Sequence, residues 1–320
     1  MKIVMVDHPR KANDKQVYMQ SFCDAWKESG GELYQPDPKM RMRLYRHFMK
    51  FIVKTGLYRR KHDKAFIVCS RGRHLLRSSI PYLFKGEIIP MLWDCWPASW
   101  DILEKDLRKL KCRLCFITSS AVVAEMQRRL PDICFVHVAE GVDDKDYNQG
   151  ELLTNRKIDV FEVGRRHNYY HYRLINSGFE SGHTFIHHNS PIKAKMNLTF
   201  DNWNDYTNTL SETKIGISFP NSLTNPKQKG HVETLTMRYW EQMLSRCVIV
   251  GHCPKELIDI IGYNPVIEAD FVDPAQQLSN ILEHISDYQE MVDRNYQTAL
   301  TNASWSKRMP VILENVSKIY

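Results

Sequence analysis

The sequence is poor in glycine and proline, with 14 of each among 320 residues, which excludes collagen-like chains and chains made mostly of linkers. It has no uninterrupted apolar run near the roughly 18 residues that a membrane-spanning helix needs. Its first residues, MKIVMVDHPRK, lack the apolar core of a secretion signal. Eight cysteines over this length are too few for a disulfide scaffold and are typical of a reducing compartment. We therefore expect a globular, cytoplasmic protein.

Metal-binding patterns are also scarce. Cys112 and Cys115 form one CxxC pair, but no second pair follows at the spacing of a zinc site. His183, His187 and His188 have only loose ligand spacing, and the sequence contains no P-loop, GxGxxG or GxSxG motif. These gaps predict a protein without a bound metal.

Positive charge is concentrated in one segment. The net charge is +7, but residues 41–64 hold nine basic residues and one acidic residue, so the remainder has a net charge of −1. A single local patch does not favour a general nucleic-acid-binding surface. The nine basic residues are Arg41, Arg43, Arg46, Lys50, Lys54, Arg59, Arg60, Lys61 and Lys64.

The same segment has the pattern of an amphipathic helix. Its apolar residues recur at helical spacing and are Met40, Leu44, Phe48, Phe51 and Ile52. A basic amphipathic helix is typical of an element that binds a membrane surface. The alternative is a helix whose apolar side faces the core and whose basic side is solvated. On the first interpretation, the residues that face an anionic membrane or the acceptor are Arg43, Lys50, Lys54, Arg59 and Arg60.

Short apolar runs alternate with helical stretches along most of the chain. The runs predict strands at Lys2–Asp7, Ala65–Ser70, Ile88–Trp93, Leu114–Ser119, Ile133–Val138, Ile158–Val163, Thr184–His187, Lys214–Phe219, Cys247–Val250 and Pro265–Glu268. The stretches between them predict helices at Ala12–Ser29, Ser99–Leu110, Ala121–Leu130, Tyr169–Ser177, Val232–Ser245 and Pro254–Ile261. Continuous apolar strands are buried on both faces. The pattern predicts an α/β fold with doubly wound parallel sheets that bind ligands at the carboxyl ends of their strands.

A polar stretch at Asp143–Lys157 divides this pattern into two similar halves. We expect one Rossmann-like domain at residues 1–145 and a second at 157–300. Residues 301–320 are expected to form a C-terminal helix that crosses back to the first domain.

Two glutamates stand out in the stretch HVETLTMRYWEQMLSRCVIVG, residues 231–251. If a helix begins near Thr234, Glu233 lies at its N-terminus, and Glu241 lies two turns further on and about 80° around the axis. A helix N-terminus beside the carboxyl end of a strand favours phosphate and other anions. The alternative is an amphipathic helix whose first glutamate only complements the helix dipole.

The pattern of Glu233, seven residues, Glu241 and a β run resembles the donor-site signature of retaining, nucleotide-sugar-dependent glycosyltransferases with the GT-B fold. Other segments resemble that family in the same order, namely MLWDCWP, FITSSAVVAEMQ, VAEGVD, DVFEVGRR and ISFPNSLTNP. The resemblance covers residues 89 to about 255 and is greatest to bacterial surface-polysaccharide transferases. It implies two Rossmann-like domains that face a cleft, the second of which binds the donor.

The resemblance also implies residue roles. It places Glu233 against the donor sugar, Glu241 against the ribose hydroxyls and Arg165 against the diphosphate. The donor-binding helix start would comprise Thr234, Leu235 and Thr236. A guanidinium and helix-end amides stabilise the charge of a leaving diphosphate without a metal. The nucleotide sugar is then a substrate, and no cofactor is expected.

The chain departs from the family pattern after Arg165, where these enzymes usually carry a lysine. Arg166, His171 or Arg173 would supply the second positive charge. The glycine-rich loop after the first strand is also replaced, by His8-Pro9-Arg10-Lys11. These departures bear on the identity of the donor.

Asp94 follows a predicted strand and matches the aspartate of the family's "HD" segment, with Trp93 in place of the histidine. In the related enzymes this edge faces the acceptor, so the resemblance implies a catalytic position for Asp94. The alternative is that Asp94 only caps the next turn. Arg71 and Arg73 also follow a predicted strand. They are either solvated turn residues or contacts to an anionic substrate.

Two interpretations of function remain. The first is a retaining, metal-independent glycosyltransferase that moves a sugar from a nucleotide-sugar donor to a glycan or lipid-linked acceptor. Such an enzyme would act in cell-surface polysaccharide synthesis, in the cytoplasm or on the inner face of the membrane. The second is a non-catalytic sugar-nucleotide-binding protein, or a scaffold partner of another transferase. No nucleic-acid partner is expected.

Overall fold

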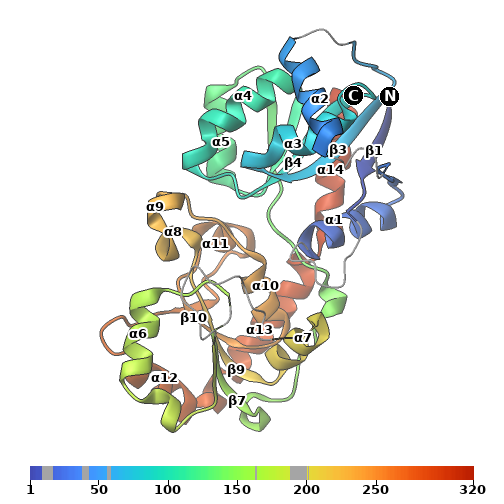
Figure 1. Ribbon diagram of the computed structural model, residues 1–320. Helices are drawn as coiled ribbons and strands as arrows, with labels where there is room; N and C mark the ends of the chain where they lie inside the picture. The colour runs from blue at the N-terminus through green and yellow to red at the C-terminus, as the bar shows by residue number, and fades with distance from the viewer. Residues whose placement is uncertain (9–16, 38–42, 56–58, 163, 188–199, 201) are drawn as a thin grey trace. The chain divides into compact units, whose positions relative to one another are not determined.

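The computed structural model describes residues 1–8, 17–37, 43–55, 59–162, 164–187, 200 and 202–320. These residues form two compact units, each built on a parallel sheet (Figure 1). The first unit comprises Met1–Glu140, Lys227–Val232 and Trp305–Tyr320, and the second comprises Gly141–Pro226 and Glu233–Ser304. Two doubly wound parallel sheets confirm the predicted α/β class and GT-B architecture.

The sheet of the first unit has the strand order β2-β1-β3-β4-β5-β6. Its strands are β1 (Lys2–Val6), β2 (Glu32–Tyr34), β3 (Lys64–Arg71), β4 (Glu87–Trp93), β5 (Leu114–Ile117) and β6 (Cys134–His137). The helices of this unit are α1 (Val17–Glu28), α2 (Arg43–Thr55), α3 (Leu75–Ser79), α4 (Trp100–Leu110), α5 (Ser120–Arg129) and α14 (Met309–Ile319). The short edge strand β2 is missing from the sequence prediction, because three residues show no period.

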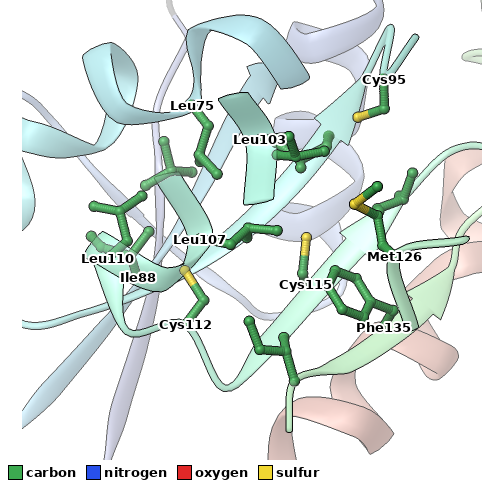
Figure 2. Packing of buried hydrophobic residues seen from close by; sticks show 14 of the residues in the cluster. Leu75, Ile88, Cys95, Leu103, Leu107, Leu110, Cys112, Cys115, Met126 and Phe135 are labelled. Carbon is green, nitrogen blue, oxygen red and sulfur yellow. The ribbon is translucent and has the colours of Figure 1, made fainter. Parts of the chain in front are cut away.

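Alternate residues of β3 enter different cores. Phe66 and Val68 belong to a cluster with α3, α4 and α5, in which Leu103 and Leu107 are fully buried (Figure 2). Ala65 and Ile67 belong to a second cluster with α1 and α14. The sheet is therefore covered on both faces, as its continuous apolar strands predict.

The C-terminal segment packs onto the first sheet. The Trp305 ring lies 5.1 Å from that of Phe22 in α1 and 5.9 Å from that of Trp93 in β4. Met309 and Ile312 of α14 extend the same buried cluster. Apolar burial therefore holds this segment in the first unit.

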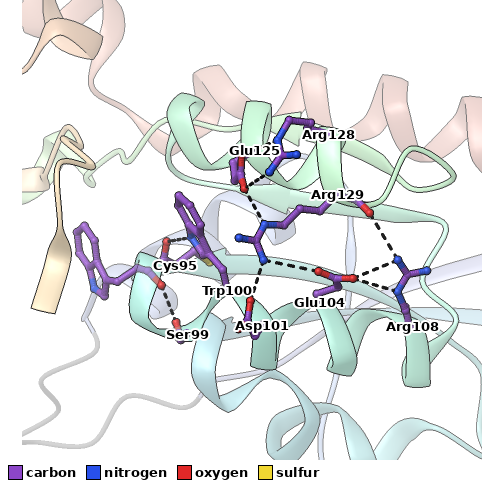
Figure 3. A network of polar contacts seen from close by, with 10 residues as sticks. Cys95, Ser99, Trp100, Asp101, Glu104, Arg108, Glu125, Arg128 and Arg129 are labelled. Atoms are coloured by element: carbon purple, nitrogen blue, oxygen red, sulfur yellow. Dashed lines mark hydrogen bonds and ion pairs between the residues drawn. The ribbon is translucent and has the colours of Figure 1, made fainter.

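A surface network connects α4 to α5 (Figure 3). Arg129 donates to Glu125 of its own helix at 2.7 Å and to Asp101 of α4 at 2.9 Å. Hydrogen bonds from Arg128 and Arg129 lower the pKa of Glu125 to about 2. The network lies on the exposed faces of two helices whose other faces are buried in the cluster beneath, and exposed ion pairs add little to stability.

The sheet of the second unit has the strand order β11-β10-β9-β7-β8. Its strands are β7 (Ile158–Glu162), β8 (Phe185–His187), β9 (Thr213–Ser218), β10 (Val248–Gly251) and β11 (Val266–Glu268). The remaining α-helices in the part of the chain that the structure describes are α6 (Asn168–Asn176), α7 (Trp203–Ser211), α8 (Asn221–Thr224), α9 (Pro226–Lys229), α10 (Met237–Leu244), α11 (Lys255–Ile261), α12 (Pro274–Glu283) and α13 (Gln289–Asn302). Val160 packs with α6 and α12, whereas Phe161 packs with Leu210 of α7.

Among the described residues, none of the helices combines the length and apolar character needed to cross a membrane. The same residues contain no group of three or more His, Cys, Asp and Glu side chains placed to hold a metal ion.

Candidate functional site

Charged side chains gather at the carboxyl edge of the second sheet. Glu162 is the last residue of β7, Glu268 is the last of β11, and His252 follows β10. Ligands of doubly wound sheets bind at this edge. Glu233 joins them from the loop before α10.

The structure corrects the predicted position of Glu233. Helix α10 begins at Met237 with Thr236 as N-cap, so Glu233 precedes the helix and the predicted angle to Glu241 does not apply. Glu233 Oε1 accepts a 2.7 Å hydrogen bond from the backbone N–H of Lys255. Its Oε2 lies 3.2 Å from His252 Nε2. The side chain is 28% exposed, so part of it remains accessible to a ligand.

His252 lies between two carboxylates. Its Nδ1 is 2.9 Å from Oε1 of Glu268, and its Nε2 faces Glu233. Partial burial acts to lower the pKa of His252, but the hydrogen bonds and charges of Glu268 and Glu233 outweigh it and raise this pKa above the ordinary imidazole value. Sequence analysis missed both His252 and Glu268, which are 19 and 35 residues from Glu233 along the chain.

The three residues after Glu233 differ in what they offer a ligand. The N–H of Leu235 donates to the buried Glu256 carboxylate at 2.8 Å, and the Leu235 side chain is fully buried. Thr234 and Thr236 are also buried, and Thr236 Oγ1 has no hydrogen-bond partner among the described residues. A buried, unsatisfied hydroxyl is a candidate ligand contact.

Arg166 and His171 come together, as two of the three candidates for the second cation. Arg166 Nη1 lies 2.8 Å from His171 Nε2, and His171 Nδ1 is hydrogen-bonded to the buried Glu162 carboxylate. Because a guanidinium can only donate, His171 accepts at Nε2 and carries its proton at Nδ1. The third candidate, Arg173, instead donates to the backbone carbonyl of Val272.

Arg238 supports the loop that carries Arg165. Its guanidinium donates to the Arg165 carbonyl at 2.9 Å and to the Phe219 carbonyl at 3.3 Å. Gly164, at φ +97°, makes the turn into this loop. Sequence analysis missed Arg238. A basic residue in the first turn of a helix opposes the helix dipole, and that signal could have indicated its tertiary role.

Glu241 is enclosed by tyrosines. Its carboxylate accepts hydrogen bonds from Tyr147 at 3.0 Å and from Tyr206 at 2.6 Å, and the residue is 2% exposed. Burial raises the pKa of Glu241 despite these hydrogen bonds and the charge of Arg238. The carboxylate is therefore buried, and both of its oxygens accept hydrogen bonds from the protein.

Asn221 is a further residue that sequence analysis missed. It is the first residue of α8, after the short loop that follows β9, and it is 1% exposed. Neither atom of its side-chain amide has a hydrogen-bond partner among the described residues. Its place beside the carboxyl edge makes it another candidate ligand contact.

Asp94 lies at the corresponding edge of the first unit, after β4, with an unusual φ of +52°. Its carboxylate lies 3.3 Å from Arg71 Nε, and Arg71 also approaches the Tyr18 hydroxyl at 3.4 Å. The structure therefore pairs two of the sequence candidates, Asp94 and Arg71, at one sheet edge.

Helix α2 exposes much of the predicted apolar stripe. Leu44, Phe48 and Phe51 are 78%, 62% and 66% exposed. A different strip, Tyr45, Met49 and Val53, packs against the first unit. Helix α2 thus packs on the first unit through a strip that differs from the predicted stripe.

The basic candidates of this segment differ. Lys50 and Arg59 are exposed, whereas Arg60 Nη2 donates to the Leu110 carbonyl at 2.6 Å. The side chains of Arg43 and Lys54 lie outside the described part of the structure.

Two doubly wound parallel units define the GT-B class of fold. Among solved structures the chain is similar to sucrose-phosphate synthase from Thermosynechococcus elongatus, with a TM-score of 0.62, 9% identity and 99% of each chain covered. It is also similar to HepE of Anabaena in complex with UDP, with a TM-score of 0.60, 11% identity, and 99% and 100% of the chains covered.

A glycosyltransferase from Rickettsia africae ESF-5 is similar too, with a TM-score of 0.55, 10% identity, and 99% and 98% of the chains covered. Likeness at these identities establishes the fold. No family model matches the chain, and no curated protein matches it in sequence.

Proposed function

We propose that the chain is a glycosyltransferase that moves a sugar from a nucleotide-sugar donor to a glycan or lipid-linked acceptor, with retention of configuration and without a metal. A role in cell-surface polysaccharide synthesis belongs to the same proposal. The observation that carries it is the combination of Arg166, held by His171, with a partly accessible Glu233 at the carboxyl edge of the second sheet.

The arginines are suited to a diphosphate. Arg165 and Arg166 follow β7 in succession, and the buried Glu162–His171 pair fixes the direction of Arg166. Fixed guanidinium groups stabilise the charge that builds on a leaving phosphate, which is the task of a metal ion in other transferases. Arg238 holds the backbone of Arg165 and so contributes to the position of the pair.

Glu233 is suited to the sugar. Lys255 N–H and His252 orient its carboxylate, which contacts sugar hydroxyls near the carbon where positive charge develops. The bond between the anomeric carbon and the diphosphate oxygen breaks, and the acceptor oxygen bonds to that carbon on the same face. The acceptor proton passes to the departing phosphate, so no protein nucleophile is required.

The first test is nucleotide binding. The melting temperature would be measured with UDP, GDP, CDP and dTDP and their sugars, in the presence of EDTA, starting with UDP because HepE binds it. A ligand at 100 times its Kd stabilises the folded state by about 2.7 kcal/mol. Failure of every nucleotide to bind rejects the proposal.

The second test is the product. NMR of the glycoside should show the donor's anomeric configuration, and inversion contradicts the mechanism. Binding without turnover on any acceptor supports the alternative, a non-catalytic sugar-nucleotide-binding or scaffold partner.

The proposed acceptor side includes a membrane surface. The exposed apolar strip of α2, Leu44, Phe48 and Phe51, lies beside the basic positions 43, 47, 50 and 54 of the same helix. Apolar side chains that enter the lipid boundary and basic side chains that meet anionic headgroups act together in such helices. This surface would bring the enzyme to a lipid-linked acceptor.

A further inference from the structure

His252 is placed to control Glu233. It follows β10 directly, and each of its ring nitrogens lies within 3.2 Å of a different carboxylate, those of Glu233 and Glu268. The Tyr239 hydroxyl donates to the His252 carbonyl at 2.6 Å, which fixes the backbone beneath the ring. The imidazole therefore bridges the loop before α10 and the end of β11.

The other charged groups nearby are engaged elsewhere. The Lys255 ammonium is bound by Asp259 at 2.6 Å, so Lys255 reaches Glu233 only through its backbone N–H. The neighbouring thiol of Cys253 has its pKa raised to about 12 by burial and by the charges of Glu233 and Glu268, so it stays neutral. Among the described residues, the positive charge that faces Glu233 directly is that of His252.

We propose that His252 is a positioning residue, which holds Glu233 in its sugar-binding position only while both ring nitrogens carry protons. The inference rests on the proposed transferase function. It adds a pH-dependent control of that function through a residue that need not touch the substrate.

The chemistry of the neutral ring gives the reason. A neutral imidazole keeps one N–H and turns the other nitrogen into an acceptor. The closer approach of Nδ1 to Glu268, 2.9 Å against 3.2 Å on the other side, favours retention of the Nδ1 proton. A lone pair of Nε2 then faces the Glu233 carboxylate and repels it. Glu233 keeps its hydrogen bond from the Lys255 N–H but loses its attractive contact with His252.

The first experiment needs no substrate. NMR titration of the His252 ring in the full-length protein should give a midpoint above the ordinary imidazole value, since the two carboxylates raise its pKa. Glu268→Gln and Glu233→Gln should each lower the midpoint. As a matched control, His62→Gln removes a histidine that pairs with Glu87 in the first unit and should leave the titration unchanged. A midpoint insensitive to Glu233→Gln overturns the inference.

The second experiment follows the pH profile of transfer. The wild-type kcat should fall on the alkaline side with the His252 midpoint, while the KM for the donor changes little. His252→Gln should lower kcat roughly tenfold at neutral pH and abolish that alkaline limb. His252→Lys, which keeps a positive charge, should hold its activity to higher pH than the wild type. An unchanged alkaline limb in His252→Gln overturns the inference.

The two experiments separate the possible failures. If no donor is turned over, the proposed function fails, and the NMR titration still decides whether Glu233 raises the His252 midpoint. If the His252 variants transfer sugar and their kcat falls on the alkaline side as in the wild type, the proposed function stands and the inference about His252 is wrong.

Discussion

Glu233 and Glu241 belong to one sequence pattern, yet their surroundings differ. Glu233 is 28% exposed and held by a backbone N–H and a histidine, whereas Glu241 is 2% exposed and held by two tyrosines. An accessible carboxylate can contact a substrate, and an enclosed one supports the structure around it. Substitution of the two residues should therefore have different effects.

Glu233→Gln should lower kcat and kcat/KM together while the Kd of the donor changes little. The reason is that the lost interaction strengthens as charge develops on the sugar. Steady-state kinetics with a separate measurement of donor Kd checks this. A rise in KM at constant kcat would instead indicate simple ground-state binding.

Glu241→Gln should reveal the cost of the buried carboxyl. Because burial raises the pKa of Glu241 in the folded protein, its contribution to stability is full below the ordinary carboxyl pKa and declines as pH rises through the raised value. The difference in the free energy of unfolding, wild type minus variant, should therefore fall as pH rises and then level off. The total fall should be about 1.4 kcal/mol for each unit by which the pKa of Glu241 in the folded protein exceeds that in the unfolded chain. Urea unfolding between acidic and neutral pH measures it.

The control for this measurement is Glu314→Gln on the surface of α14. The Lys318 hydrogen bond lowers the pKa of Glu314, so its contribution is present above the ordinary carboxyl pKa and lost as pH falls. The two profiles should slope in opposite directions. A flat or rising difference for Glu241→Gln contradicts the prediction.

His171→Asn tests the support of Arg166. Asparagine can keep a donor toward Glu162 but removes the acceptor for Arg166 at Nε2. The Kd of the donor should rise about tenfold, as for one lost charge-assisted hydrogen bond. Arg166→Ala should have a similar effect, and the double variant should be little worse than either. Additive losses in isothermal titration would show that the two residues act independently.

At the scale of elements, α2 carries two apolar strips. Tyr45, Met49 and Val53 pack inward, and the strip of Leu44, Phe48 and Phe51 remains exposed. Their helical positions separate the two strips by more than a quarter turn. A surface helix that only supports its own core needs the first strip alone, so the second fits a partner surface.

Replacement of Leu44, Phe48 and Phe51 with glutamine should abolish flotation of the protein with anionic vesicles. Each buried CH₂ contributes about 0.8 kcal/mol, so the loss should persist at any salt concentration. Val272→Gln changes another exposed apolar residue, 76% exposed in the second unit, and should bind as the wild type does.

Charge on the same helix should act differently. Replacement of Arg43, Lys50 and Lys54 with glutamine should weaken vesicle binding by about 1 kcal/mol per residue at low salt, with turnover of a soluble acceptor nearly unchanged. Equal flotation of wild type and both variants would show that α2 is an ordinary surface helix.

At the scale of the whole molecule, each unit has its own core. Trp305→Ala should destabilise the first unit by about 3–5 kcal/mol, because Trp305 is buried against Phe22 and Trp93. A nucleotide should raise the transition of the second unit alone. Val311→Ala, at an exposed site on α14, is the control for Trp305→Ala. Calorimetry with and without UDP can resolve the transitions of the two units. If the nucleotide raised only the transition of the first unit, the donor site would not lie in the second unit.

The sequence by itself determined the α/β class and the parallel sheets. Apolar runs such as Ile88–Trp93 and the helices between them follow local periods, which depend on residues a few positions apart. The spacing of Glu233 and Glu241 and the Arg165–Arg166 pair are local too, and the structure places Glu233 and Arg166 beside residues at the carboxyl ends of strands in the second unit.

Only the tertiary structure decided how those residues are held. His252 and Lys255 contact Glu233, and Glu268 contacts His252, because parallel strands end at one edge, although the three residues are 19 to 35 residues away from Glu233 in sequence. The helix period leaves both apolar strips of α2 available, and packing selected the inner one. Long-range contacts set the partner of each side chain, and a local pattern carries no record of them.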